Sequence, residues 1–184
     1  MPGARRELDI IKKQTKDKDN IEVIDLIDKE GTVERVKEEM KKANWVHFAC
    51  HGVQKVNRPT ESALMLAGTS KLTLSEIITM RLPSKDLAFL SACQTATGDE
   101  DLSEEAVHLA AGMLSAGYRG VIATMWSISD WYAPRVADDV YGHLIQRERK
   151  ATDGAEALYC AVKNLREKEK APFRDWIPFI HVGL

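Results

Sequence analysis

The chain has 184 residues, a formal net charge of −2 and 44% hydrophobic residues. These values are typical of one soluble globular domain, and the charge gives no electrostatic reason to expect nucleic-acid binding. No apolar run approaches the roughly 20 residues that span a bilayer, so we expect no membrane segment. The three cysteines, Cys50, Cys93 and Cys160, are too widely spaced to form a disulfide framework. Together with the absence of a targeting signal, this indicates a cytoplasmic protein.

The first part of the chain predicts two helices with a strand between them. Residues 4–15 have a weak helical pattern. Residues 21–27 predict a strand in which the acids Glu22 and Asp25 interrupt the apolar residues, as expected of an edge strand. Thr32 is suited to cap a second helix that carries one apolar face.

Two short apolar runs, residues 45–50 and residues 87–90, predict central strands of a parallel sheet, the first of them buried on both faces. Between them, residues 62–66 predict a strand of a hairpin. Thr73 and Glu76 then form the capping box of a further helix.

The second half of the chain continues to alternate apolar strands with amphipathic helices. The predicted elements are a helix capped by Ser103, a strand at 121–125, helices at 135–146 and 154–167, and a closing strand at 177–182. This alternation predicts an α/β fold with a mostly parallel sheet covered by helices. We expect a single domain over residues 1–184, because no linker or repeat divides the chain.

Two predicted strands end in residues that suit nucleophilic catalysis. His51 follows the strand at 45–50, and Cys93 follows the strand at 87–90. If these strands are neighbours, an imidazole and a thiol emerge side by side at the carboxyl edge of the sheet, where α/β proteins bind ligands. A cysteine nucleophile needs such a base, and the base can later protonate a leaving amine. The backbone N–H groups of Gly52 and Cys93 are candidate donors to an oxyanion.

Residues 46–52, VHFACHG, and residues 90–98, LSACQTATG, look like the two signature segments of CHAT domains, a family of caspase-like cysteine peptidases. Lesser segments agree in order and extend the match over nearly the whole chain: residues 2–7, 61–64, 116–130 and 176–183. The resemblance implies a caspase-like sheet with helices on both faces and a catalytic dyad of His51 and Cys93. It also implies a protein substrate, and a fold that needs no metal or nucleotide cofactor.

The chain departs from the family pattern at its front. Members usually have an apolar strand before the segment that resembles residues 2–7, and no such strand precedes it here. We therefore expect the chain to be a piece of a longer protein. The resemblance implies that an upstream helical-repeat domain or a partner protein regulates it. Cleavage of a linker is not the expected activation, because no long linker separates Cys93 from Val121.

The residue before the scissile bond is expected to lie between the strand ends that carry Ser91 and Met125, against the turn from Trp126 to Asp130. Related peptidases with basic specificity often place an acid two residues before the nucleophile, and here that residue is Ser91. The candidate acids are then Asp130 and the acidic run that begins at Asp99. We expect a basic residue rather than an aspartate before the scissile bond.

Other interpretations of the same residues stay open. The domain could be a catalytically silent signalling or docking module, a redox sensor based on Cys93, or a zinc site built from Cys50, His51 and Cys93. Cys50 is more simply a core residue, because it should point away from His51. His47 is more simply a hydrogen-bonded core histidine, and Cys160 an inert helix residue.

Overall fold

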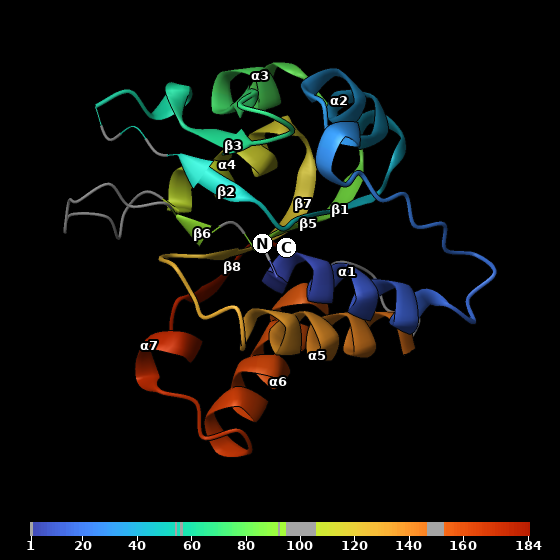
Figure 1. Ribbon diagram of the computed structural model, residues 1–184, viewed down its shortest axis with the longest axis vertical. Coiled ribbons are helices and arrows are strands. Elements are labelled where there is room, and N and C mark those ends of the chain that lie inside the picture. The colour runs from blue at the N-terminus through green and yellow to red at the C-terminus, as the bar shows by residue number, and fades with distance from the viewer. Residues whose placement is uncertain (1, 54, 56, 92, 95–105, 147–152) are drawn as a thin grey trace.

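A four-stranded sheet of order β1–β5–β7–β8 forms the centre of the molecule (Figure 1). The computed structural model describes residues 2–53, 55, 57–91, 93–94, 106–146 and 153–184. The strands of this sheet are Trp45–Phe48 (β1), Lys85–Leu90 (β5), Tyr118–Thr124 (β7) and Phe179–Gly183 (β8). β1, β5 and β7 run parallel, and β8 runs antiparallel to β7. The predicted mostly parallel sheet is therefore confirmed.

A second, smaller sheet of order β4–β3–β2–β6 continues from two strands of the first. Its strands are His51–Val53 (β2), Ala63–Met65 (β3), Lys71–Thr73 (β4) and Cys93–Gln94 (β6). β3 pairs antiparallel with both β2 and β4, which confirms the predicted hairpin. β2 follows β1, and β6 follows β5, after two residues each. The second sheet thus begins where β1 and β5 end.

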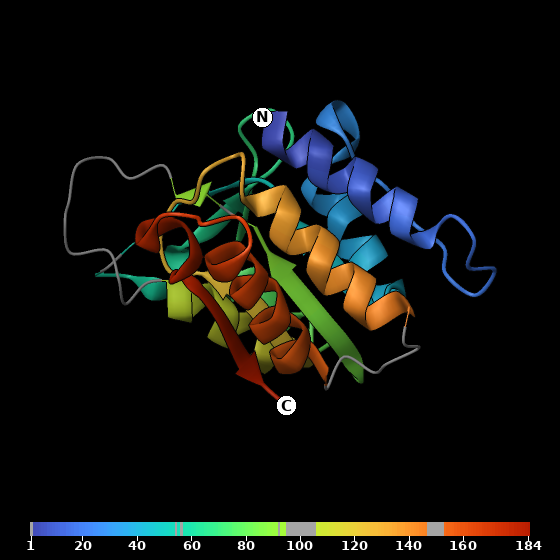
Figure 2. The ribbon, with the colours of Figure 1, turned by 90° about the horizontal axis from the view of Figure 1, so that it is seen from below.

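Helices cover both faces of the central sheet. They are Pro2–Thr15 (α1), Val33–Lys42 (α2), Leu74–Thr79 (α3), Ala106–Ala116 (α4), Ala133–Gln146 (α5), Gly154–Glu167 (α6) and Phe173–Trp176 (α7), with short 3-10 turns at Asp28–Glu30 and Pro59–Glu61. Figure 2 shows α1, α5 and α6 lying along one face of the sheet. No helix of the described ranges is both long and apolar enough to traverse a bilayer.

Alternate residues of the central strands belong to two separate hydrophobic cores. In β5, Ala88 and Leu90 belong to the core that includes residues of α2, α3 and α4. Leu87 and Phe89 belong to the opposite core, which includes residues of α5 and α6. All four side chains are buried. This two-sided burial is why β5 is apolar at every position from Leu87 onward.

Both helix caps predicted in the first half of the chain are present. The Thr32 hydroxyl accepts a hydrogen bond from the Arg35 N–H at 3.3 Å. The Thr73 hydroxyl accepts from the Glu76 N–H at 3.3 Å, while the Glu76 carboxylate accepts from the Thr73 N–H at 2.9 Å. A hydrogen bond from Lys37, followed by the bonds from Thr73, lowers the pKa of Glu76 to about 2. The capping box is thus a charged junction between α2 and α3.

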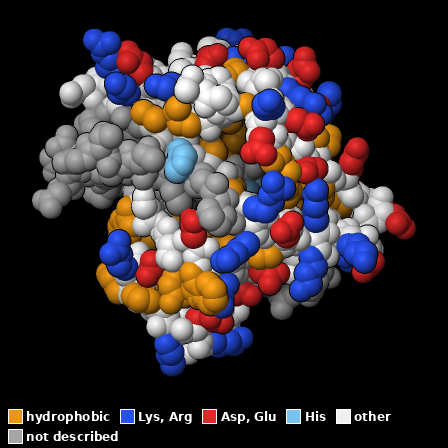
Figure 3. All heavy atoms as spheres, in the orientation of Figure 1, with side chains coloured by type: hydrophobic (Ala, Val, Ile, Leu, Met, Phe, Trp, Pro, Cys, Tyr) orange, Lys and Arg blue, Asp and Glu red, His pale blue; other side chains and the backbone are white. Residues whose placement is uncertain are grey.

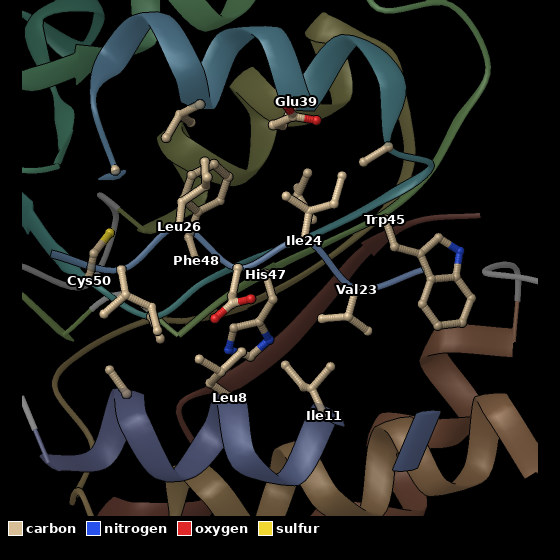
Figure 4. A pocket seen from close by; sticks show the side chains of 18 of the residues that line it. Leu8, Ile11, Val23, Ile24, Leu26, Glu39, Trp45, His47, Phe48 and Cys50 are labelled. Atoms are coloured by element: carbon tan, nitrogen blue, oxygen red, sulfur yellow. The ribbon is translucent and has the colours of Figure 1, made fainter. Parts of the chain in front are cut away.

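Residues 21–27 form no strand, so that prediction is wrong. Within the described chain, β1 pairs only with β5 and is the edge of the central sheet. A cavity of about 1370 Å³ is lined by both segments and by residues of α1 and α2. Figure 4 shows its side chains, with Val23, Ile24 and Leu26 from the irregular segment and Trp45, His47 and Phe48 from β1. Sheet membership requires a strand edge within hydrogen-bonding distance, and the cavity lies where that edge would be.

The open edge also corrects the expected burial of residues 45–50. Trp45, Val46 and His47 are only half-buried, and Phe48 alone of β1 is buried. The apolar run therefore predicted a parallel strand correctly but placed it wrongly in the middle of the sheet. An edge strand that lines a cavity can have the same apolar composition as a central strand.

We predict that Thr73→Ala lowers the free energy of unfolding by about 1 kcal/mol, because it removes the N-cap of α3. Chemical denaturation measures this change directly. Thr73→Ser keeps the cap and is the matched control, which should lose much less stability. Equal denaturation midpoints for Thr73→Ala and the unaltered protein would show that the cap contributes nothing to the fold.

Candidate active site

The pairing of β1 with β5 continues in the same register into the pairing of β2 with β6. Trp45 pairs with Leu87 in the first sheet, and His51 pairs with Cys93 in the second. Partners are 42 residues apart in both cases. Both strands are interrupted by two residues at the same level and resume together. This confirms that the two predicted strands are neighbours, as the juxtaposition of the histidine and the cysteine requires.

His51 and Cys93 occupy directly paired positions on adjacent parallel strands. Neighbouring strands lie about 4.8 Å apart, so the two backbones hold an imidazole-bearing residue directly beside a thiol-bearing residue. The His51 side chain is exposed. Gly52 is buried between Leu64 of β3 and Gln94 of β6.

The residues expected to bind substrate lie at the ends of β5 and β7. Ser91 directly follows β5, and its side chain is buried. Trp126 is half-buried in the turn after β7, where its indole N–H donates to the Arg174 carbonyl oxygen at 3.0 Å. Asp130 is exposed in the same turn. The acidic run from Asp99 lies outside the described residues.

The first turn of α1 packs against the turn that carries Asp130. A Cβ atom placed on Gly3 would lie 3.0 Å from the Asp130 carboxylate oxygen Oδ1, so the two segments are nearly in contact. α1 therefore reaches the carboxyl end of the sheet as well as covering one face. α1 therefore lies at the edge of the candidate site, although the sequence analysis assigned no functional residue to it.

Glu7 of α1 is the centre of a buried polar network next to that edge. Its side chain is 3% exposed. The Ser91 hydroxyl donates to Glu7 Oε1 at 3.0 Å, and His47 Nε2 lies 2.9 Å from Glu7 Oε2. The other ring nitrogen of His47, Nδ1, lies 3.0 Å from the Tyr141 hydroxyl of α5. The network thus joins two helices to β1 and to the end of β5, and it confirms that His47 is a hydrogen-bonded core residue.

The Glu7 carboxylate accepts hydrogen bonds from two directions. A carboxylate oxygen can only accept, so His47 Nε2 carries a proton and donates it to Glu7 Oε2. The Ser91 hydroxyl donates to Glu7 Oε1. Burial, and then the charge of Glu7, raise the pKa of Tyr141, so its hydroxyl stays protonated beside His47 Nδ1.

The sequence analysis missed Glu7, although a signal for it is present. Glu7 is four residues after Gly3 and four before Ile11, so all three share one face of α1. Gly3 is buried, and Ile11 packs against the core that includes α5 and α6. An acid on such a face must find a hydrogen-bonding partner inside the protein. His47, on a strand expected to be buried, was the residue to pair with it.

The remaining cysteines and acids show no further site. Cys50 is half-buried, lines the cavity and packs against the core that includes α2, α3 and α4. Cys160 is half-buried on α6. In the part of the chain that the structure describes, no three His, Cys, Asp or Glu side chains come together as metal ligands.

Hydrophobic side chains gather on the surface over α7 (Figure 3). Phe173 is 64% exposed and packs edge-on against Trp176, with 5.1 Å between the ring centroids. α7 also provides the carbonyl oxygen that holds Trp126. An exposed apolar surface therefore adjoins the turn expected to bind substrate.

The central sheet is mostly parallel and lies between two layers of helices. Two of its adjacent strands, β1 and β5, continue into the paired residues His51 and Cys93. This architecture is that of a caspase-like α/β protein. The chain belongs to the CHAT domain family, whose model matches residues 1–184, the whole chain. This family is related to the caspase-like cysteine peptidases. A search among curated proteins returns no match for the chain.

We predict that His47→Ala destabilises the protein by about 2–3 kcal/mol. The change leaves the buried Glu7 carboxylate without its ring N–H donor and the Tyr141 hydroxyl without its hydrogen-bonding partner. Thermal and chemical unfolding give the measurement. Tyr141→Phe, which removes only the hydroxyl, is the matched variant and should cost about 1 kcal/mol. A His47→Ala protein as stable as the unaltered one would refute the structural role of the network.

Proposed function

We propose that this CHAT domain is a cysteine endopeptidase in which Cys93 is the nucleophile and His51 the base. The observation that carries the proposal is the direct pairing of these two residues on β2 and β6, in a register continuous with the central sheet. The relation of the family to caspase-like peptidases supports it. A reducing cytoplasm, which keeps such a thiol in its active form, suits this chemistry.

In the proposed reaction, His51 takes the thiol proton of Cys93, and the thiolate attacks the carbonyl carbon of the scissile peptide bond. The C–N bond breaks, the amine leaves with the proton from His51, and the acyl group remains on Cys93 as a thioester. Water then gives a proton to His51 and attacks the thioester. The carboxylic acid product leaves, and the proton returns to the sulfur of Cys93.

The negative oxygen that develops in each step needs hydrogen-bond donors. The proposed donors are the backbone N–H groups of Gly52 and Cys93. Gly52 suits this role because it has no side chain to keep a substrate carbonyl away from its N–H. Its buried position between β3 and β6 also fixes its backbone.

We predict that Cys93→Ala and His51→Ala each abolish cleavage of a fluorescent peptide library while leaving the unfolding temperature nearly unchanged. Residues that act as one catalytic unit are not additive, so the double variant should be no less active than either single variant. Brief, substoichiometric iodoacetamide should label Cys93 well ahead of Cys50 and Cys160, because a paired histidine activates its thiol. Cys50→Ala is the matched control and should keep its activity.

The same experiment separates the competing interpretations. Cleavage at an unchanged rate by Cys93→Ala would exclude the proposed mechanism. A reactive Cys93 without any cleavage, in the presence of every activating partner, would favour a redox sensor. Equal labelling of all three cysteines, again without cleavage, would favour a signalling or docking module.

We further propose that an upstream helical-repeat domain or a partner protein gates this activity. Two features support gating. The cavity beside β1 extends along that strand to Cys50 and His51, so a change in its shape acts directly on the base. The apolar surface over α7, which includes Phe173, adjoins the turn of Trp126 and is of the kind that marks protein interfaces.

We predict that the 184-residue chain alone cleaves a given peptide more slowly than the same chain joined to its regulatory domain or mixed with its partner. A population shift toward an active arrangement should raise kcat/KM by about tenfold or more, which corresponds to about 1.4 kcal/mol. Side-by-side kinetics on one peptide test this. Equal specific activities would refute gating without affecting the proposed dyad.

A further inference from the structure

The outer edge of β1 carries backbone hydrogen-bonding groups that no described strand satisfies. The Asn44 carbonyl oxygen accepts from the Asp86 N–H at 2.9 Å, so the backbone of Asn44 faces β5. Successive residues of a strand direct their backbone groups to opposite sides, so those of Trp45 and His47 face away from β5. Within the described chain, neither residue forms a backbone hydrogen bond across the cavity to the segment 21–27. Unpaired backbone groups of this kind favour the addition of another strand.

The cavity beside this edge is lined by four parts of the chain. β1 and the segment 21–27 line two of its sides, and α2 and α1 line the others. Figure 4 shows Leu8 and Ile11 pointing from α1 toward β1. Val36 and Met40 of α2 make the other helical side equally apolar. An occupant therefore buries both of its faces, as a central strand of a parallel sheet does. A strand rises about 3.3 Å per residue, so about six residues extend along the neighbouring run from β1 to its end.

Glu39 of α2 adds one polar requirement to this apolar space. Its Oε1 atom accepts from Lys42 Nζ at 3.0 Å, while its Oε2 atom is buried and has no hydrogen-bond donor among the described residues. Glu39 lines the cavity, and Figure 4 shows it on the α2 side, opposite Leu8 and Ile11 of α1. A buried acceptor without a donor costs free energy, and an occupant that carries a donor removes that cost. The occupant that fits is therefore apolar on both faces, with one donor side chain directed toward α2.

The segment 21–27 is held near its two ends and is exposed in its middle. Ile21 packs against the core that includes α5 and α6, and Leu26 packs against the core that includes α2, α3 and α4. Between them, Ile24 is 47% exposed. The salt bridge from this segment to α1 is partly exposed as well, and such a bridge contributes little stability. The middle of the segment can therefore move outward and admit a strand from another protein.

We infer that the cavity binds an extended, mainly apolar segment of a partner protein, which pairs with β1 as an added strand and donates a hydrogen bond to Glu39 Oε2. Main-chain hydrogen bonds to the edge provide affinity, and side chains on the two faces of the added strand provide specificity. The consequence for activity rests on the proposed peptidase function. β1 is followed after two residues by β2, which begins at His51, so an added strand fixes the part of the chain that carries the base. This segment is then the element of the partner that gates cleavage.

The test uses a capped peptide of about eight residues, in which valine and isoleucine alternate around one central lysine, with a soluble polyethylene-glycol tail. Calorimetric titration measures its binding to the 184-residue chain. The same peptide with every central backbone nitrogen methylated cannot donate to β1 and should bind about tenfold more weakly or less. Ile24→Glu, which places a charge in the wall of the cavity, should weaken binding as much. Tyr159→Glu, at a side chain 63% exposed on α6, is the matched control and should bind normally.

A second comparison tests the role of Glu39. A peptide with norleucine in place of lysine has no donor and should bind the unaltered protein more weakly, by about threefold to tenfold. Glu39→Leu removes the acceptor and should abolish the preference for lysine. Glu38→Leu, at the exposed acid beside it on α2, is the matched control and should keep that preference.

Equal binding of the methylated and unmethylated peptides would overturn the inference, because it would show apolar binding without strand pairing. Binding of palmitate but of neither peptide would overturn it in favour of a lipid site. A concentration-dependent dimer that excludes the peptide, seen by sedimentation, would overturn it in favour of a second copy of the chain.

The effect on cleavage is measured with the fluorescent peptide library at saturating strand peptide. The strand peptide should raise kcat/KM by about tenfold or more. Binding without any change in a measurable cleavage rate would overturn the gating role and leave the peptidase proposal standing. Binding of the strand peptide without any cleavage would count against the peptidase proposal and leave the strand site standing.

Discussion

The register between β1 and β5 is the constraint on which the candidate site depends. A shift of one residue in that pairing would move every side chain of one strand to the other face of the sheet. The two cores prevent such a shift, because Leu87 and Phe89 fill one of them while Ala88 and Leu90 fill the other. The positions of His51 and Cys93, six residues beyond Trp45 and Leu87, follow from this register. Packing far from the chemistry therefore sets its geometry.

The network around Glu7 applies a second constraint, between the helical layer and the sheet. An apolar contact between α1 and β1 would hold the two elements together, but it would tolerate sliding. Hydrogen bonds from His47 and Ser91 to one carboxylate have defined directions and tolerate much less. The hydrogen bonds of this one carboxylate therefore fix the position of α1 on the sheet.

Local signals in the sequence were sufficient for most of the fold. α6 has the predicted bounds, 154–167. They could be predicted because the signals for this helix, Gly154 and the apolar spacing after it, lie within the helix itself. The Thr73 and Glu76 capping box was predicted and is present, because both partners lie within four residues. The pairing of His51 with Cys93 could be inferred because parallel strands end at the same edge of a sheet.

The features that were missed depend on partners far apart in the sequence. Residues 21–27 have the composition of a strand, but the cavity lies between them and the edge of β1, so they pair with no strand. Glu7 looks like a solvent-facing acid of a charged helix. Its burial follows from His47 and Ser91, which lie 40 and 84 residues away. Tertiary contacts of this kind override local pattern, and the sequence offered only the position of Glu7 on the apolar face as a sign of them.

The outer edge of β1 affects how the domain behaves at high concentration. An uncovered strand edge is a template to which another chain can add, and it promotes aggregation unless charges or covering segments protect it. Within the described chain, the segment 21–27 provides such protection beside the cavity, and a salt bridge of 2.9 Å between Lys12 and Asp25 ties it to α1. Both side chains of this bridge are partly exposed, so dissolved salt screens their attraction. Raised ionic strength therefore weakens the protection of the edge and favours self-association through β1.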